Sequence, residues 1–391
     1  MSPPVEPVDG PVMRLPGSDQ FVLVLGFWIL VLALVVGMVL AVRRWRRRRS
    51  DPSAGWVTPG LVGAAVFAAL GLAMVVANRP IPFRTPTFPP LPELVPESSF
   101  FNSAVDGLPA AAESQQWIAS QRDAAGAPLD LVPGFYSGVT DGVVYGIPFN
   151  VVDDRTPRVD VDIVRFPGSS SPGPYPITDP AYIQSLPAYG IDNHYVAYDP
   201  SSNTSWELLA ARRWFGRWEA DSGAVWDLDD LGYSDGSTTA SGLPLLPGLV
   251  TYDQVASGSV DHVVLATTPV IRTEGWVWPA RKTDGRVPGV GPPPMGSWMR
   301  LRADAPVDGL GPQARVVARA LQRHGLIVSD TGGRFALRGT PDARWDDRDL
   351  ATLSTLDAND FEFVDASSLF VAEDTMEARP PVSPAGAVEG G

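Results

Sequence analysis

The chain has 391 residues, of which 45% are hydrophobic and 19% charged, and its net charge is −14. It contains no cysteine, which excludes disulfides, thiolate catalysis and cysteine-ligated zinc. Residues 1–80 carry 8 arginines and 4 acids, whereas the rest of the chain carries 22 basic and 40 acidic residues. An acidic body of this kind repels polyanions, so no nucleic acid is expected as a partner.

Two uncharged apolar runs occupy residues 21–42 and 57–77, and the basic segment 43–56 separates them. Each run has the roughly 20 residues that an α-helix needs to cross a membrane. Because positive charge in a short loop stays in the cytoplasm, the loop is predicted to face inward and the polar tail 1–20 outward. The basic residues follow the first run, which disfavours a cleaved signal peptide. We therefore predict a transmembrane hairpin in the plasma membrane, with an extracytoplasmic C-terminal domain.

Proline is dense in residues 78–97, which predicts a semi-rigid, extended stalk. Residues 98–375 form the predicted exterior domain, which is long enough to bury a large core without disulfides. The final residues, 376–391, are rich in proline, glycine and alanine and are predicted to be disordered.

Strand patterns dominate the predicted exterior domain. Runs of β-branched and aromatic residues predict strands at 143–152, 159–166, 194–198, 206–209, 262–266, 275–278, 298–301, 325–329, 334–337 and 361–364. Two helices are predicted, at 311–324, with Pro312 at its start, and at 346–356. Strands outnumber helices and no βαβ alternation is present, so the fold class is predicted as mainly β with a few peripheral helices. No fixed repeat indicates a propeller or a solenoid.

The sequence lacks the Gly-x-Ser-x-Gly elbow, the phosphate-binding glycine loop, His-Glu-x-x-His and the Rossmann fingerprint. It does contain eight distinctive segments in order, namely YGIP (145–148), PGPYPI (172–177), SGAVWDL (222–228), GLPLLPGL (242–249), VWPAR (277–281), PPMG (293–296), PDARW (341–345) and NDFE (359–362). Over roughly residues 100–371 these resemble a family of exported proteins from actinobacteria and other soil bacteria. The resemblance implies no particular activity. It implies that His194 and His262 match family positions, and that Lys282 stands where members tend to carry histidine.

His194 and His262 are the candidate groups for proton transfer, because each lies in a predicted strand beside an acid or amide. The alternative is that both are buried histidines bonded to turn carbonyls. The third histidine, His324, lies at a predicted helix end, where a structural role is expected.

Glu207 and Asp227 are the candidate carboxylate partners, since two carboxylates some 5–10 Å apart are what glycosidic cleavage requires. The alternative is chance clustering in an acidic domain. No metal-ligand motif or cofactor motif is present, and no cofactor is expected. The acidity leaves room for a divalent cation such as calcium, although a solvated surface has the same composition.

Tryptophan is abundant in the exterior domain, and its ring can stack on the apolar face of a sugar. Trp206, Trp226 and Trp278, with Arg281, are therefore the candidate substrate-binding residues. The alternative is that these tryptophans belong to the core of a domain without disulfides.

These observations predict a membrane-tethered cell-surface protein that acts on or binds an envelope or extracellular polysaccharide. If it is an enzyme, it is a glycoside hydrolase or lyase with His194 or His262 as acid or base and Glu207 and Asp227 as partners. The first alternative is a non-catalytic envelope module that binds wall polymer or an unidentified protein. The second is a sensor that couples exterior binding to the hairpin.

Overall fold

The computed structural model describes residues 86–380 except 138, 141–142, 145, 185–191 and 215, together with Trp28, Val36 and Val39. The last three are helical and exposed. In this described part, no helix is long and apolar enough to cross a membrane. Apart from these three residues, the predicted hairpin, the tail 1–20 and residues 78–85 of the predicted stalk lie outside the described residues, as do residues 381–391 of the predicted tail.

A six-stranded mixed sheet forms the larger part of the fold. Its strands, in spatial order, are β1 (Leu131–Val132), β16 (Phe335–Leu337), β13 (Val264–Thr268), β15 (Leu326–Thr331), β14 (Trp298–Leu301) and β17 (Phe361–Val364). The β1–β16 and β13–β15 pairs are parallel and the other neighbours are antiparallel. Helix α5 (Pro312–Arg323) packs on one face, because its buried Val317 and Leu321 belong to the same apolar cluster as Val328.

A four-stranded sheet covers the other face of the six-stranded sheet. Its order is β12 (Ser222–Asp227), β9 (Thr204–Leu209), β8 (Tyr195–Asp199) and β4 (Phe149–Val151), with only the β4–β8 pair parallel. Side chains alternate across a strand. Val196 and Tyr198 therefore pack toward the six-stranded sheet in one cluster with Leu265, whereas Tyr195 and Ala197 pack outward in another.

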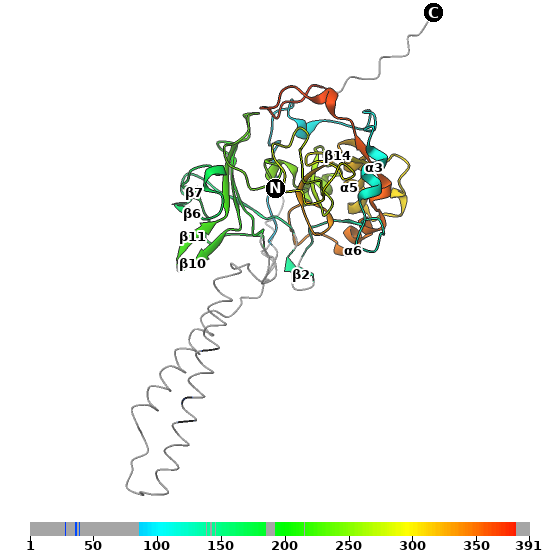
Figure 1. Ribbon diagram of the computed structural model, residues 1–391. Helices are drawn as coiled ribbons and strands as arrows, with labels where there is room; N and C mark the ends of the chain where they lie inside the picture. The colour runs from blue at the N-terminus through cyan, green and yellow to red at the C-terminus, as the bar shows by residue number, and fades with distance from the viewer. Residues whose placement is uncertain are drawn as a thin grey trace, which may run out of the picture.

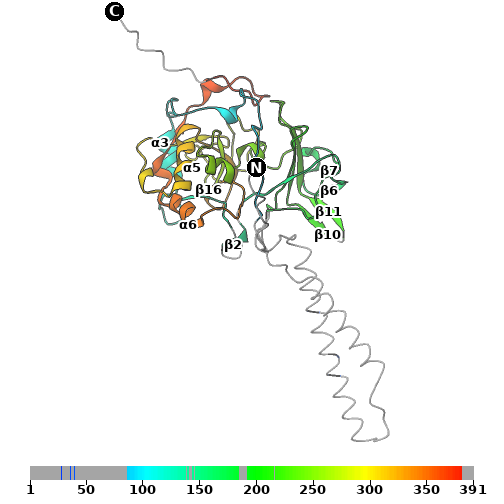
Figure 2. The same ribbon diagram turned by 180° about the vertical axis from the view of Figure 1, so that it is seen from behind.

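Three small sheets complete the strand content of the described part of the fold. They are β5 (Arg158–Val159) with β7 (Tyr175–Pro176), the three strands β10 (Arg212–Trp214), β11 (Arg217–Ala220) and β6 (Val161–Ile163), and β2 (Val139–Thr140) with β3 (Val143–Val144). In Figure 1 the strands β6, β7, β10 and β11 lie on one side of the fold and α3, α5 and α6 on the other, and Figure 2 shows the same division from behind.

The remaining helices are short. They are α3 (Ser114–Ser120), α4 (Tyr252–Ser257), α6 (Asp347–Leu350) and the 3-10 helices η1 (Phe100–Asn102), η2 (Pro167–Ser169), η3 (Leu246–Gly248), η4 (Val307–Gly309), η5 (Ala351–Thr355), η6 (Ala358–Asp360) and η7 (Ser367–Leu369). The predicted β-rich class with few helices is thus confirmed.

Four local predictions were wrong in part or in full. Residues 143–152 divide into the separate strands β3 and β4, and strand structure within 159–166 is limited to the end of β5 and to β6. Residues 275–278 form a loop with an isolated bridge between Trp276 and Met295, because prolines at 279 and 292–294 interrupt the ladder. Residues 346–356 form one α-helical turn and then a 3-10 helix. The hydroxyls of Thr352 and Thr355 bond the carbonyls three residues earlier and so compete with regular helical bonding.

Both ends of the described segment pack on the fold. Phe88 is buried against Phe149, and its amide donates to the Asp342 carboxylate at 3.1 Å. At the other end, the amide of Ala378 donates to the carbonyl of Ser98 at 2.7 Å. Packed structure therefore extends into parts of the predicted stalk and the predicted tail.

Candidate functional sites

Glu207 is completely buried between the two large sheets. It stands opposite Val196 of β8 and Ala224 of β12, so the residues directly across the two ladders are apolar. Its Oε2 accepts from the Thr238 hydroxyl at 2.5 Å, and its Oε1 accepts from the Leu245 amide at 2.7 Å. Burial raises the pKa of Glu207 to about 7, and these hydrogen bonds offset part of the rise.

His194 lies on the same side of β8 and β9 as Glu207. The ladder register places it one step beyond Val196, diagonal to Glu207. Burial lowers the pKa of His194, and the neighbouring Arg338 guanidinium lowers it further. Among the described residues, the imidazole Nδ1 has no hydrogen-bond partner. The two predicted groups are thus brought to one layer of the protein.

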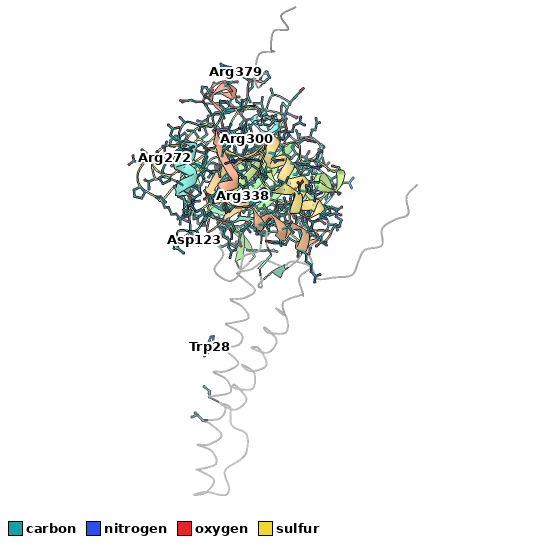
Figure 3. The ribbon with its side chains drawn as sticks, turned by 90° about the vertical axis from the view of Figure 1, so that its right-hand side faces the viewer. Trp28, Asp123, Arg272, Arg300, Arg338 and Arg379 are labelled. Atoms are coloured by element: carbon teal, nitrogen blue, oxygen red, sulfur yellow. The ribbon has the colours of Figure 1, made fainter. Side chains whose placement is uncertain are left out.

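Asp330 and Arg338 form an ion pair in the same layer, with 2.7 Å between Arg338 Nη2 and Asp330 Oδ2. The Ala240 amide donates to Asp330 Oδ1 at 2.5 Å, so the segment from Thr238 to Ala240 connects this pair with Glu207. Burial raises the pKa of Asp330, and Arg338 opposes that rise. Figure 3 places Arg338 within the body of the fold, whereas Asp123 lies at its margin.

We call His194, Glu207, Thr238, Asp330 and Arg338 the inter-sheet network. It contains groups able to hold or transfer a proton, but each of these side chains is nearly or completely shielded from solvent. Lys282 reaches its edge, where burial lowers the pKa of the amine and the nearby Asp330 carboxylate offsets part of that effect.

His262 lies at the opposite end of the β13–β15 pair from Asp330. It precedes β13, beside His324, which precedes the parallel strand β15, whereas Asp330 is near the end of β15. Six residues of strand separate His324 from Asp330, a span of about 20 Å. The Nδ1 of His262 donates to its neighbour's carbonyl, that of Val263, at 2.9 Å, and burial lowers its pKa to about 4. The structure therefore does not bring His262 and His194 together.

Asp227 is also separated from Glu207. On β12, Ala224 faces the same side as Glu207, and Asp227, three residues on, faces the opposite side. It is exposed in a shallow cleft of about 430 Å³ that Asp230 and Tyr233 also line. Glu207 and Asp227 consequently do not form a carboxylate pair around one bond.

Two of the candidate tryptophans belong to apolar cores. Trp206 is 7% exposed, with the Arg158 guanidinium 4.5 Å from its ring centroid, and Trp226 is 2% exposed. Arg281 is exposed and lies 4.7 Å from the ring centroid of Tyr233. The burial of Trp206 and Trp226 agrees with the alternative that these tryptophans belong to the core and do not bind substrate.

Trp278 lines a cavity of about 450 Å³, which we call the aromatic cavity. Its walls are Ala111, Ala112, Glu113, Trp117, Val277, Trp278, Ser297, Trp298, Val364, Asp365, Ala366, Ser367 and Phe370. These residues come from the start of α3, the loop before Pro279, strand β14, the end of β17 and the segment around η7. Concave sites with aromatic walls and a few polar groups are typical ligand sites.

Ring contacts hold the walls of the aromatic cavity in place. Trp278 donates its indole N–H to the Thr375 carbonyl at 3.1 Å and meets Phe370 edge-on, with 6.0 Å between ring centroids. Trp117 meets Phe363 of β17 edge-on at 5.3 Å. The rings are therefore set before any ligand arrives, which reduces the ordering cost of binding.

The polar groups of the aromatic cavity are mostly acceptors. Glu113 and Asp365 are exposed carboxylates, and Ser367 hydrogen bonds lower the pKa of Asp365. The indole N–H of Trp298 has no partner among the described residues. Sequence reasoning missed these residues as a group, because the wall positions are spread from 111 to 370 without a common spacing.

In the part of the chain that the structure describes, no three histidine, aspartate or glutamate side chains are arranged to hold a metal ion. Comparisons of the chain with protein-family models, curated protein sequences and solved structures found no match. The resemblance to exported actinobacterial-type proteins accordingly stays a prediction, and function has to be argued from these sites alone.

Proposed function

We propose that this protein is a membrane-anchored, extracytoplasmic binding protein for a cell-surface or extracellular polysaccharide. The aromatic cavity is the observation that carries this proposal. Its tryptophan and phenylalanine rings offer apolar faces to sugar rings, and its carboxylates offer acceptors to hydroxyl groups. Binding is proposed ahead of catalysis because the candidate acid and base groups are enclosed between the sheets.

The anchor is supported by the two uncharged apolar runs at 21–42 and 57–77 with the basic segment between them. Trp28, Val36 and Val39 of the first run are helical and 60%, 42% and 42% exposed, as side chains facing lipid would be. Alkaline phosphatase fused after Glu97 should be active in cells. An inactive fusion would overturn the orientation.

Binding can be tested with the full chain in lipid nanodiscs and a panel of hexasaccharides, by isothermal titration calorimetry. Trp117→Ala and Trp278→Ala should each weaken binding at least about tenfold, since loss of a stacked ring costs on the order of 1.5 kcal/mol. Trp276→Ala is the matched control, because Trp276 is 50% exposed and is not part of the cavity wall. Full-strength binding by the Trp117 and Trp278 variants would refute this site.

A second candidate function is cleavage of the bound polymer by hydrolysis or elimination. The observation in its favour is that His194 and Glu207 share one layer and that the pKa of Glu207 is raised to about 7, near the working range of a general acid. New reducing or unsaturated ends, lost in Glu207→Gln and His194→Ala, are the expected products. If no new ends form with any polysaccharide of the panel, cleavage is refuted and binding remains the proposed function.

A further inference from the structure

We propose that the aromatic cavity selects an amine-bearing sugar, that is, a unit of a polysaccharide whose amino groups are unacetylated and protonated. This inference names the ligand class of the site described above and rests on the proposed function. Three features of the cavity carry it: its charge, its ring faces and its balance of donors and acceptors.

The charge of the aromatic cavity is negative. Glu113 and Asp365 are in its wall, and no lysine or arginine is among the described residues that line it. Arg300, two residues beyond Trp298 on β14, does not neutralise them, because its Nε and Nη2 bond Glu362 at 2.9 and 2.8 Å. Its Nη1 is committed to the backbone carbonyls of residues 105, 106 and 108. A cation is therefore attracted into the cavity and an anion is repelled.

The rings add a second attraction for a cation. An ammonium group over the face of a tryptophan is stabilised by the ring quadrupole, most strongly where water is excluded. The N–H of Trp278 is already bonded to Thr375, so what this side chain can still contribute to a ligand is its ring. The aromatic walls beside two carboxylates thus combine sugar stacking with recognition of positive charge.

The hydrogen-bonding groups favour a ligand rich in donors. The hydroxyl of Ser297 already donates to Pro294, and that of Ser367 bonds Asp365, so neither is free to donate to a ligand. The indole N–H of Trp298 has no partner among the described residues, but it is enclosed in a side chain that is 2% exposed and so is not presented to a ligand. Acetylation of a sugar amine removes the charge and adds an acceptor, and a uronate or phosphate adds negative charge. Each of these changes makes the ligand less complementary to a negatively charged wall that is rich in hydrogen-bond acceptors.

The test compares hexasaccharides of glucosamine, N-acetylglucosamine, glucose and galacturonic acid on the full chain in nanodiscs, in mildly acidic buffer where the amines are protonated. The glucosamine oligomer should bind at least about tenfold more tightly than the acetylated one, the gain expected of a hydrogen bond to a charged group. The preference should shrink as salt is added.

The double variant Glu113→Gln with Asp365→Asn should abolish the preference, so that the glucosamine oligomer binds no more tightly than the acetylated one. Both amides keep acceptor oxygens, so the Ser367 bonds can persist. Glu93→Gln with Asp154→Asn is the control, since it makes the same charge change at exposed positions outside the cavity wall. Equal affinity for the amino and acetylated oligomers, or a preference that survives the first double variant, would overturn this inference alone. Failure of every oligomer to bind would overturn the proposed function and the inference with it.

Discussion

Thr238 donates a 2.5 Å hydrogen bond to the carboxylate of Glu207, and the two residues are 2% and 0% exposed. The same carboxylate accepts from the Leu245 amide, next to η3. Glu207 therefore connects β9 with the loop between Thr238 and Leu245, and through Ala240 with the ion pair of Asp330 and Arg338. A buried acid in this position makes the stability of the fold depend on pH.

Glu207→Gln should change that dependence in a defined direction. The pKa of Glu207 is about 7 in the fold, against 4.5 for the free side chain, so the folded state holds the proton more tightly. The stabilisation is therefore full below about pH 4.5 and is lost as pH rises through about 7, by roughly 3 kcal/mol. Relative to the parent, the glutamine variant should gain this amount between pH 4.5 and 8.

Urea unfolding followed by tryptophan fluorescence at several pH values measures this gain. Glu377→Gln, at an exposed position, is the control and should keep the parent's profile. A Glu207→Gln curve parallel to that of the parent across the whole range would contradict the assignment of the raised pKa to this residue.

His262 should act in the opposite direction. Its pKa is lowered to about 4 by burial, so the unfolded chain binds a proton that the fold excludes. Its stabilising contribution is present above about pH 6.5 and is lost as pH falls through about 4, by roughly 3 kcal/mol. His262→Asn, whose amide can replace the bond to Val263, should flatten the acid limb of the unfolding profile. The prediction is wrong if the variant loses stability in acid as steeply as the parent.

Gly296 should not tolerate a side chain. Its φ is +85°, and an added Cβ would collide with the Val277 carbonyl and lie 2.6 Å from the Cβ of Ala280. Gly126, at φ +84° with open space around it, isolates the conformational part of the cost. Gly126→Ala should cost about 1 kcal/mol, and Gly296→Ala substantially more, because the loop that carries Trp278 must move. Equal shifts in melting temperature would show that the loop adjusts freely.

Arg344 should hold the segment around Phe88 against the fold. Its guanidinium bonds Asp342 and Asp253 and donates to the Phe88 carbonyl at 3.0 Å, while Asp342 itself accepts from the Phe88 amide. Arg344→Lys loses the forked geometry and leaves the Asp342 carboxylate, 1% exposed, poorly compensated, at a cost of about 3 kcal/mol.

Hydrogen exchange checks this prediction at the amide of Phe88, which should exchange much faster in the Arg344→Lys chain. Arg155→Lys, at an exposed turn, is the matched control. Unchanged protection of Phe88 would mean that the aromatic contact with Phe149 is sufficient to hold the segment.

Local patterns predicted individual elements well. Strands at 298–301 and 361–364 and the helix from Pro312 were correct, because alternation, a proline start and a glycine end are properties of short stretches of chain. The segment 275–278 was wrong because a strand also needs a partner, and the flanking prolines remove the donors that a ladder requires.

The candidate site depended much less on local sequence. By itself the sequence determined the composition, the acidic body free of cysteine and the strand-rich character of the fold. It also identified His194 and Glu207 as candidate acid–base residues, but it could not predict that both would be buried in one layer between two sheets. Strand alternation then turned Asp227 to the opposite face from Glu207, and the parallel strands β13 and β15 put His262 at the far end from Asp330. The aromatic cavity exists only because α3, β14, β17 and the Trp278 loop meet in space, and contacts between residues so distant along the chain leave no spacing that a sequence pattern can reveal.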